Sequence, residues 1–172
     1  MKRSILIFAG LLIVSLFSLN VYASNIAFVN LGKAIQTCKA GLDAKSYIQR
    51  MANVKKAVID KKANAAKEIY KQIKSGKLNA KDKKSKEELY QIKLKDLERY
   101  RSDAVAEIQT KEKDLTSNII EGLVQTVKII AKKRNLDAVF ETNQGVIYWN
   151  NAKDITKDVV AAYDKEYAKS KK

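Results

Sequence analysis

The chain has 172 residues, with 34 Lys and Arg against 19 Asp and Glu, which gives a formal net charge of +15. It contains one cysteine, no histidine and no proline. This composition excludes an intrachain disulfide, zinc sites and histidine-based catalysis, because each of these needs a second cysteine or a histidine.

Residues 1–23 are predicted to be a cleaved signal peptide. Residues 2–3 are basic, an apolar run follows from Ile5 to Leu19, and Val21-Tyr22-Ala23 is a small-residue cleavage pattern. The alternative is an uncleaved anchor, but the apolar run is shorter than the roughly 20 residues that span a bilayer. We therefore expect a mature chain that begins at Ser24, carries a net charge of +13 without Lys2 and Arg3, and is exported from the cytosol.

The mature chain opens with an apolar run, Ile26–Val29, which predicts a strand. A short helix is expected from Leu31 to about Lys39, and Gly41 is expected to end it. Cys38 shares the apolar face of this helix. A small buried residue is the expected role of Cys38, and a disulfide between chains is the alternative.

Residues 42–134 are predicted to form a long antiparallel helical hairpin with its tip near 75–80. This stretch is rich in Lys, Glu, Ala and aliphatic residues, which lose little entropy in a helix. Its only cluster with turn chemistry is Ser75-Gly76-Lys77-Leu78-Asn79. The returning helix, from about Lys81 to Arg134, would be on the order of 80 Å long.

Both helices of the hairpin carry narrow apolar seams typical of a coiled coil. The outgoing seam consists of Ile48, Ala52, Ile59, Ala66, Ile69 and Ile73, and Lys55 and Lys62 interrupt it. The returning seam consists of Leu89, Leu97, Tyr100, Ala104, Ile108, Leu115, Ile119, Leu123, Val127 and Ile130. A reversal near residue 79 would place Ile59 opposite Tyr100, so the two seams meet.

The remaining residues, 24–41 and 135–172, are predicted to form a β/α body. Leu136–Glu141 and Val146–Trp149 read as a β-hairpin, and Asp154 as the N-cap of a last helix. About three short strands and two short helices expose edges and bury little surface. We therefore expect the body to oligomerise. The fold class is mainly α with a small β part.

The outer half of the arm is strongly basic. Residues 55–101 contain sixteen Lys and Arg and seven Asp and Glu, a net charge of +9. A solvated helix face explains any single lysine, but the excess as a whole should attract acidic partners. Unfolded acidic chains and anionic lipids are candidates. Specific nucleic-acid binding is not expected, because the leader directs the chain out of the cytosol and the arm lacks a stacking platform.

Motifs for chemistry are scarce in this sequence. It has no glycine-rich phosphate loop, no nucleophile-elbow serine and no paired carboxylates that stand out from the helical background. We expect no enzyme activity, no cofactor and no metal.

The two ends of the mature chain resemble the Skp/OmpH family of periplasmic chaperones. The resemblance rests on Asn25–Asn30, Asn135–Glu141 and Val146–Trp149, and most specifically on the Asp154-Ile155-Thr156 helix start. It implies a homotrimer whose three bodies form a small β-barrel, from which three coiled-coil arms hang as tentacles. Such trimers enclose unfolded outer-membrane proteins without ATP, and lipopolysaccharide binding is also described for the family.

The candidate client-binding residues are the cations and aromatics of the arm: Lys55, Lys62, Tyr70, Lys74, Lys84, Tyr90, Lys93, Arg99 and Tyr100. The candidate trimerisation residues are Ile26, Phe28, Val29, Val139, Phe140, Ile147 and Trp149. Two other classes stay open: a coiled-coil structural or adaptor protein, and a basic binder of anionic lipid or nucleic acid.

Overall fold

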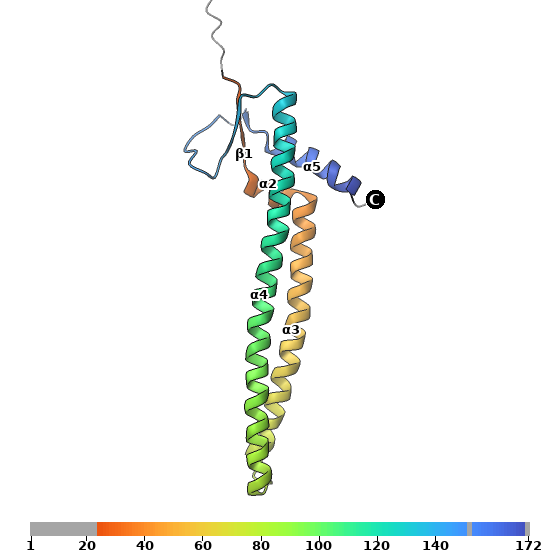
Figure 1. The fold of residues 1–172 in the computed structure, drawn as a ribbon, viewed down its shortest axis with the longest axis vertical. Coiled ribbons are helices and arrows are strands. Elements are labelled where there is room, and N and C mark those ends of the chain that lie inside the picture. Colours follow the sequence, from red (N-terminus) through yellow and green to blue (C-terminus); the bar gives the residue numbers. More distant parts are fainter. Residues whose placement is uncertain (1–23, 151–152, 171–172) are drawn as a thin grey trace, which may run out of the picture.

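A computed structural model describes residues 24–150 and 153–170, and the predicted signal peptide lies outside them. Two long helices form an arm that extends from one side of a small base (Figure 1). The arm consists of α3 (Lys39–Lys74) and α4 (Ala80–Lys133). The base consists of β1 (Ile26–Val29), α2 (Leu31–Thr37), β2 (Ala138–Glu141) and α5 (Thr156–Ser170), together with the upper end of α4.

The two long helices α3 and α4 are joined by a short turn at residues 75–79. Gly76 has a φ of +70°, a left-handed conformation that glycine adopts without steric cost. Asn79 caps α4, because its side-chain oxygen accepts a hydrogen bond from the backbone N–H of Asp82 at 2.8 Å. Lys62 contacts Asp96 across the arm, which is the register that a reversal near residue 79 requires.

The interior of the arm is thin. Between residues 51 and 110, which include the tip, three apolar residues of the arm are buried: Ala66, Leu97 and Ala104. Two of these are alanines, so each contributes little apolar area to the seam. Most other side chains along this part of the arm are exposed to solvent. The stability of the outer arm therefore depends on few residues.

The predicted boundary at Gly41 is wrong. The first short helix ends at Thr37, Cys38 takes an extended conformation (φ −73°, ψ 153°), and α3 begins at Lys39. The Cys38 sulfur accepts a hydrogen bond from the backbone N–H of Gly41, and the Asp164 carboxylate of α5 accepts one from that of Lys39 at 2.7 Å. These two acceptors satisfy the first N–H groups of α3.

The predicted β-hairpin is also wrong. β2 pairs with β1 in parallel, with Phe28 opposite Phe140, while residues 146–149 form no strand. The reason lies in the path of α4, which carries the chain back past the base to the start of β1 (Figure 1). There the backbone N–H of Asp137 donates to the carbonyl of Asn25 at 2.9 Å, so β2 must run alongside β1 in the same direction.

The other edge of β1 holds the residues that precede α5. Phe28 forms an isolated parallel bridge with Asp154, and its carbonyl accepts a hydrogen bond from the backbone N–H of Ile155 at 2.8 Å. Asp154 accepts a hydrogen bond from the N–H of Thr156, but the helix begins at Thr156 rather than directly after Asp154. The predicted N-cap thus lies one residue before the capping position.

The hydrophobic core lies between the inner face of this sheet and the helices. Ala27 and Val29 are buried on that face, and they pack with residues of α2, α4 and α5, including Ala34, Leu123 and Val159. Cys38 belongs to the same cluster and is fully buried, as expected for a small apolar residue. Burial raises the pKa of its thiol. The core therefore joins both ends of the chain to the root of the arm.

Candidate functional site

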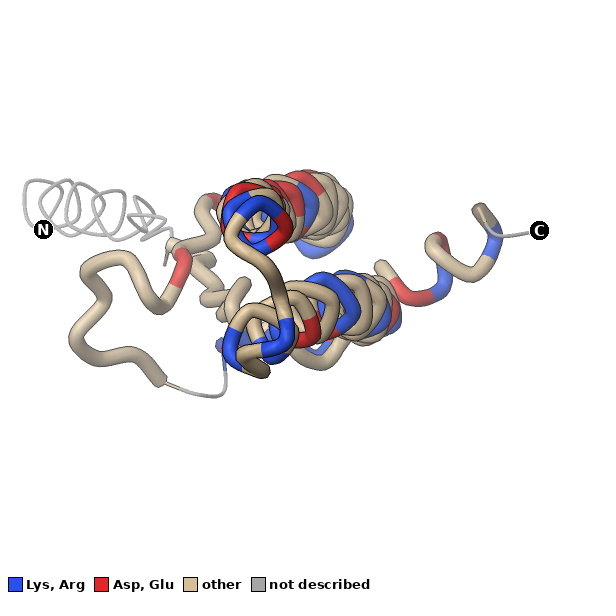
Figure 2. Tube along the Cα trace, turned by 90° about the horizontal axis from the view of Figure 1, so that it is seen from below, with Lys and Arg blue, Asp and Glu red and all other residues tan. Residues whose placement is uncertain are grey.

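Basic positions occur on both helices of the arm and around its tip (Figure 2). Acidic positions are interspersed with them but are fewer, as the sequence count over residues 55–101 shows. The arm is therefore a basic surface without a single charged stripe. Its individual cations differ in the ion pairs and aromatic contacts that they make.

Lys55 and Lys62, which interrupt the outgoing seam, lie around one aromatic ring of the opposite helix. Their ammonium nitrogens are 5.8 and 5.4 Å from the centroid of the Tyr100 ring, within the range of a cation–π interaction. Lys55 also pairs with Glu107 at 2.5 Å, and this hydrogen bond raises the pKa of Lys55. The structure thus brings together three predicted site residues, Lys55, Lys62 and Tyr100, in contacts between the two helices of the arm.

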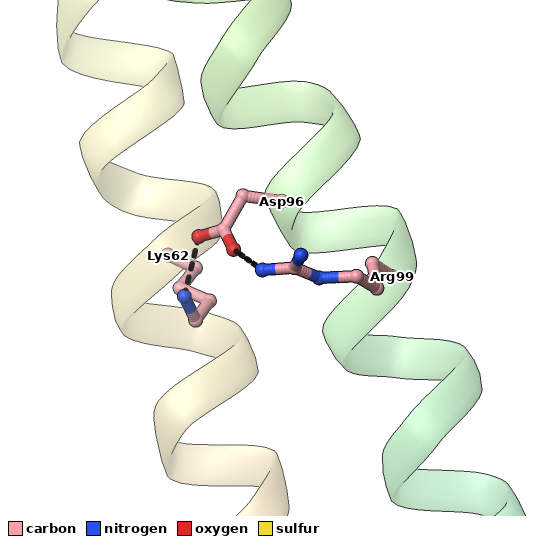
Figure 3. A network of polar contacts seen from close by, with 3 residues as sticks. All are labelled: Lys62, Asp96 and Arg99. Atoms are coloured by element: carbon pink, nitrogen blue, oxygen red, sulfur yellow. Dashed lines mark hydrogen bonds and ion pairs between the residues drawn. The ribbon is translucent and has the colours of Figure 1, made fainter.

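Asp96 of α4 joins two further predicted residues (Figure 3). Lys62 reaches it from α3 at 2.5 Å, and Arg99 reaches its other oxygen from the next turn of α4 at 3.1 Å. These hydrogen bonds, that of Lys62 above all, lower the pKa of the Asp96 carboxyl. Two cations share one carboxylate, so the site remains positive overall.

A second aromatic contact lies closer to the tip. The rings of Tyr70 and Tyr90 are 5.5 Å apart across the two helices, and the Lys74 ammonium lies 5.6 Å from the centroid of the Tyr70 ring. Tyr70 is nevertheless 44% exposed. These three predicted residues thus form an aromatic patch that a partner can still reach.

Lys84 and Lys93 are exposed, and neither makes an ion pair within the part of the chain that the structure describes. Sequence reasoning missed three exposed aliphatic residues on the same arm: Val54, Ile92 and Val105, which are 55–65% exposed. Their signal was available, because none of the three belongs to either predicted seam.

The outer face of the small sheet carries aromatic residues from three segments. The Phe28 ring lies 6.2 Å from the rings of both Phe140 and Trp149. Phe140 is 48% exposed and Ile147 is fully exposed. Among the other predicted body residues, Ile26 is half-buried and shares the strand face of Phe28 by alternation, whereas Val29 is buried on the core side and Val139 packs against the core.

Two buried polar atoms in this region lack a hydrogen-bond partner among the described residues: the Trp149 indole nitrogen and the Thr142 hydroxyl. Buried polar groups are normally satisfied. Neither atom therefore finds a protein partner among the described residues.

Residues 24–150 and 153–170 contain no group of three or more His, Cys, Asp or Glu side chains placed to hold a metal ion. No helix within these ranges has the length and apolar character that crossing a membrane requires.

Comparison with known proteins gives one matching family model and a relative with a similar sequence. A sequence model described as "Outer membrane protein (OmpH-like)" matches residues 25–163. An uncharacterized protein of Aquifex aeolicus (strain VF5) is 26% identical over 144 residues, which are 84% of this chain and 88% of that protein.

The fold is similar to a solved structure from Caulobacter crescentus CB15, a protein described as a candidate outer membrane chaperone (OmpH-like). The TM-score is 0.77 at 16% sequence identity, over 83% of this chain and 85% of the other. At 16% sequence identity, this similarity shows a shared fold and no more.

Proposed function

The chain belongs to the OmpH-like outer membrane protein family, and from this premise we propose that it is an ATP-independent periplasmic chaperone that holds unfolded outer-membrane proteins. The observation that carries the proposal is a long basic arm with a thin interior, attached to a base that leaves an aromatic sheet face uncovered. An arm of this kind suits a large, irregular partner.

The base is proposed to form a homotrimer. A two-stranded sheet is marginal by itself, and here its outer face exposes Phe140 beside Phe28, while Ile147 in the segment after β2 is fully exposed. Neighbouring copies would cover this apolar surface, and they could supply a partner for the Trp149 indole N–H. Three bodies would then form the small β-barrel that the family resemblance implies, with three arms around a common cavity.

Holding would come from many weak contacts rather than from one tight site. Exposed lysines attract acidic segments, while Tyr70 and the exposed aliphatic residues offer apolar contacts. Several arms acting on one chain raise the effective concentration of each contact, so the total affinity can be high although each contact is weak. Weak individual contacts also permit release without ATP.

The test is aggregation of a urea-denatured outer-membrane protein after dilution, followed by light scattering with and without residues 24–172. We expect suppression at about one trimer per client, and no binding to the same protein once it has folded. The absence of suppression at a several-fold excess would contradict the proposal.

Two other classes predict different results. A coiled-coil adaptor should bind one folded partner and ignore unfolded chains. A general polyanion binder should bind DNA, lipopolysaccharide or anionic vesicles with a steep salt dependence and show no preference for unfolded protein. DNA binding alone decides little, because a protein with this net charge binds DNA non-specifically.

A further inference from the structure

One flank of the arm, about midway along it, has a groove between α3 and α4. Its first part has a volume of about 320 Å³ and is lined by Val58, Lys61, Lys62, Ala65, Lys93 and Asp96. Its second part, of about 380 Å³, shares Lys93 and Asp96 and adds Ile92, Lys95 and Arg99. The first part lies between α3 and α4, whereas the second is lined by residues of α4 alone. The two parts adjoin at Lys93 and Asp96, and together they are here named the flank groove.

The flank groove contains apolar surface that the arm itself does not cover. Ile92 is 61% exposed, although most large aliphatic residues of α4 turn toward the seam. Val58 of α3 is half-buried and lines the first part of the groove. Covering such side chains is favourable in proportion to the apolar area that is removed from water. A ligand with an apolar side chain would gain this energy here.

The charge of the flank groove is strongly one-sided. Five cations line it, and Asp96 is the one acidic residue among its lining. Asp96 already pairs with Lys62 and Arg99. Lys61, Lys93 and Lys95 make no ion pair among the described residues. The groove therefore favours a ligand that carries two or more negative charges beside an apolar group.

The dimensions fit an extended polypeptide. Val58 and Ala65 are seven helical residues apart, or about 10 Å, which corresponds to about three residues of extended chain. Side chains of an extended chain alternate in direction, so an apolar side chain can enter the groove while its neighbours face the lysines. We propose that the flank groove binds an extended segment in which acidic residues alternate with aliphatic ones. This inference rests on the proposed function, because it names the segment type that the arm selects from an unfolded client.

The test uses three labelled eight-residue peptides: alternating Glu and Val, alternating Lys and Val, and alternating Glu and Ser. Fluorescence anisotropy with residues 24–172 should show the tightest binding for the first peptide. Equal binding of the Glu–Ser peptide would contradict a role for the apolar surface, and binding of the Lys–Val peptide would contradict the role of the charge.

Matched variants locate the site. Lys93→Gln with Lys95→Gln should weaken binding of the Glu–Val peptide about fivefold, because two partly screened ion pairs are lost. The control is Lys81→Gln with Lys83→Gln, which removes the same charge at the same spacing from the same helix near the tip. Equal losses in the two double variants would show that charge acts without location, and would overturn the proposal.

Ile92→Ser separates a peptide site from an anion site. Since Ile92 is largely exposed, this change should leave the helical circular dichroism signal intact. We expect at least a threefold loss for the Glu–Val peptide and no change in binding to vesicles containing anionic lipid. Unchanged binding of the Glu–Val peptide by the Ile92→Ser variant would overturn the proposal. It would also be overturned if anionic vesicles displaced the peptide equally well from the unmodified protein and from the variant.

The outcome is independent of the aggregation test. If the protein suppresses aggregation but the groove variants bind peptide like their controls, this inference is wrong and the proposed function stands. If the peptide binds at the groove and aggregation is not suppressed, the groove is a peptide site and the chaperone function is wrong.

Discussion

At the scale of single residues, the joint between α2 and α3 depends on Gly41. A Cβ atom at this position would lie 1.7 Å from the carbonyl oxygen of Ile35, a distance that requires the backbone to move. Gly76 is the opposite case: it has a positive φ but nothing lies within 4 Å of its added Cβ. The two glycines therefore serve different purposes, close approach at Gly41 and backbone conformation at Gly76.

We predict that Gly41→Ala destabilises the protein by about 2–3 kcal/mol, because the clash is with backbone in a packed joint. Gly76→Ala, the control, should cost about 1 kcal/mol, the typical cost of a left-handed conformation for a residue with a side chain. Urea unfolding of the two variants checks this. A Gly41→Ala variant as stable as Gly76→Ala would contradict the close approach.

Cys38 should be protected in the native state. Its side chain is fully buried, and burial raises the pKa of the thiol, so little thiolate is present near neutral pH. We predict slow reaction with a thiol reagent at pH 8 and fast reaction after unfolding in guanidinium chloride. A native rate close to that of free cysteine would show that the core around α2 opens readily, or that the thiol is accessible.

At the scale of elements, the contact between α3 and α4 uses charged side chains at positions where two paired helices commonly place aliphatic residues. Lys55 and Lys62 lie close to the seam, yet each pairs with an acid of α4 and lies over Tyr100. Their aliphatic stems cover the seam while their charges are compensated. A seam of this kind holds the helices in register with little apolar burial.

The pairing of Asp96 predicts a pH dependence. Since its pKa is lowered in the folded arm, principally by Lys62, the stabilisation is present above about pH 4 and is lost as the pH falls through the folded pKa. Asp96→Asn should therefore lower the thermal midpoint at pH 7, and the difference from the unmodified protein should shrink at pH 3.

Asp60→Asn provides the control for this measurement. Asp60 pairs with Lys56 of the same helix, and both side chains are more exposed than those of the Lys62–Asp96 pair. Its effect at pH 7 should be smaller. If the two variants behaved alike, the cross-helix pair would contribute nothing beyond a surface ion pair.

At the scale of the whole molecule, the base leaves its aromatic sheet face uncovered while its inner face is fully packed. This asymmetry is the physical reason to expect partner copies, since a face on which Phe140 is exposed beside half-buried Phe28 and Trp149 favours association. The arm shows no comparable aromatic cluster among the described residues except the Tyr70–Tyr90 contact.

We predict that native mass spectrometry finds a trimer of residues 24–172, and that Phe140→Lys converts it to a monomer with its helices intact. Phe140 is about half exposed, so the charge should be tolerated in the isolated chain but not between copies. Val105→Lys, on the arm, should remain trimeric. A monomeric unmodified protein would remove the proposed cavity, and a trimeric Phe140→Lys would place the interface elsewhere.

The candidate site could be predicted from the sequence only in part. The positions of the arm cations and tyrosines followed from counting charges and aromatic residues along the helices. The sequence could not predict which of these cations form ion pairs, because Lys62 meets the Asp96–Arg99 pair only when two distant segments align. The flank groove was missed for the same reason, since its lining comes from both helices.

The sequence by itself determined the arm, its tip and its basic charge. Helix propensity, seam periodicity and the turn at Gly76 are local properties, so they act wherever the segment lies. Only the tertiary structure decided the parallel pairing of β1 with β2 and the helix break at Cys38. Both depend on where α4 delivers the chain and on α5 reaching Lys39, and such long-range contacts leave no periodic signal in the sequence.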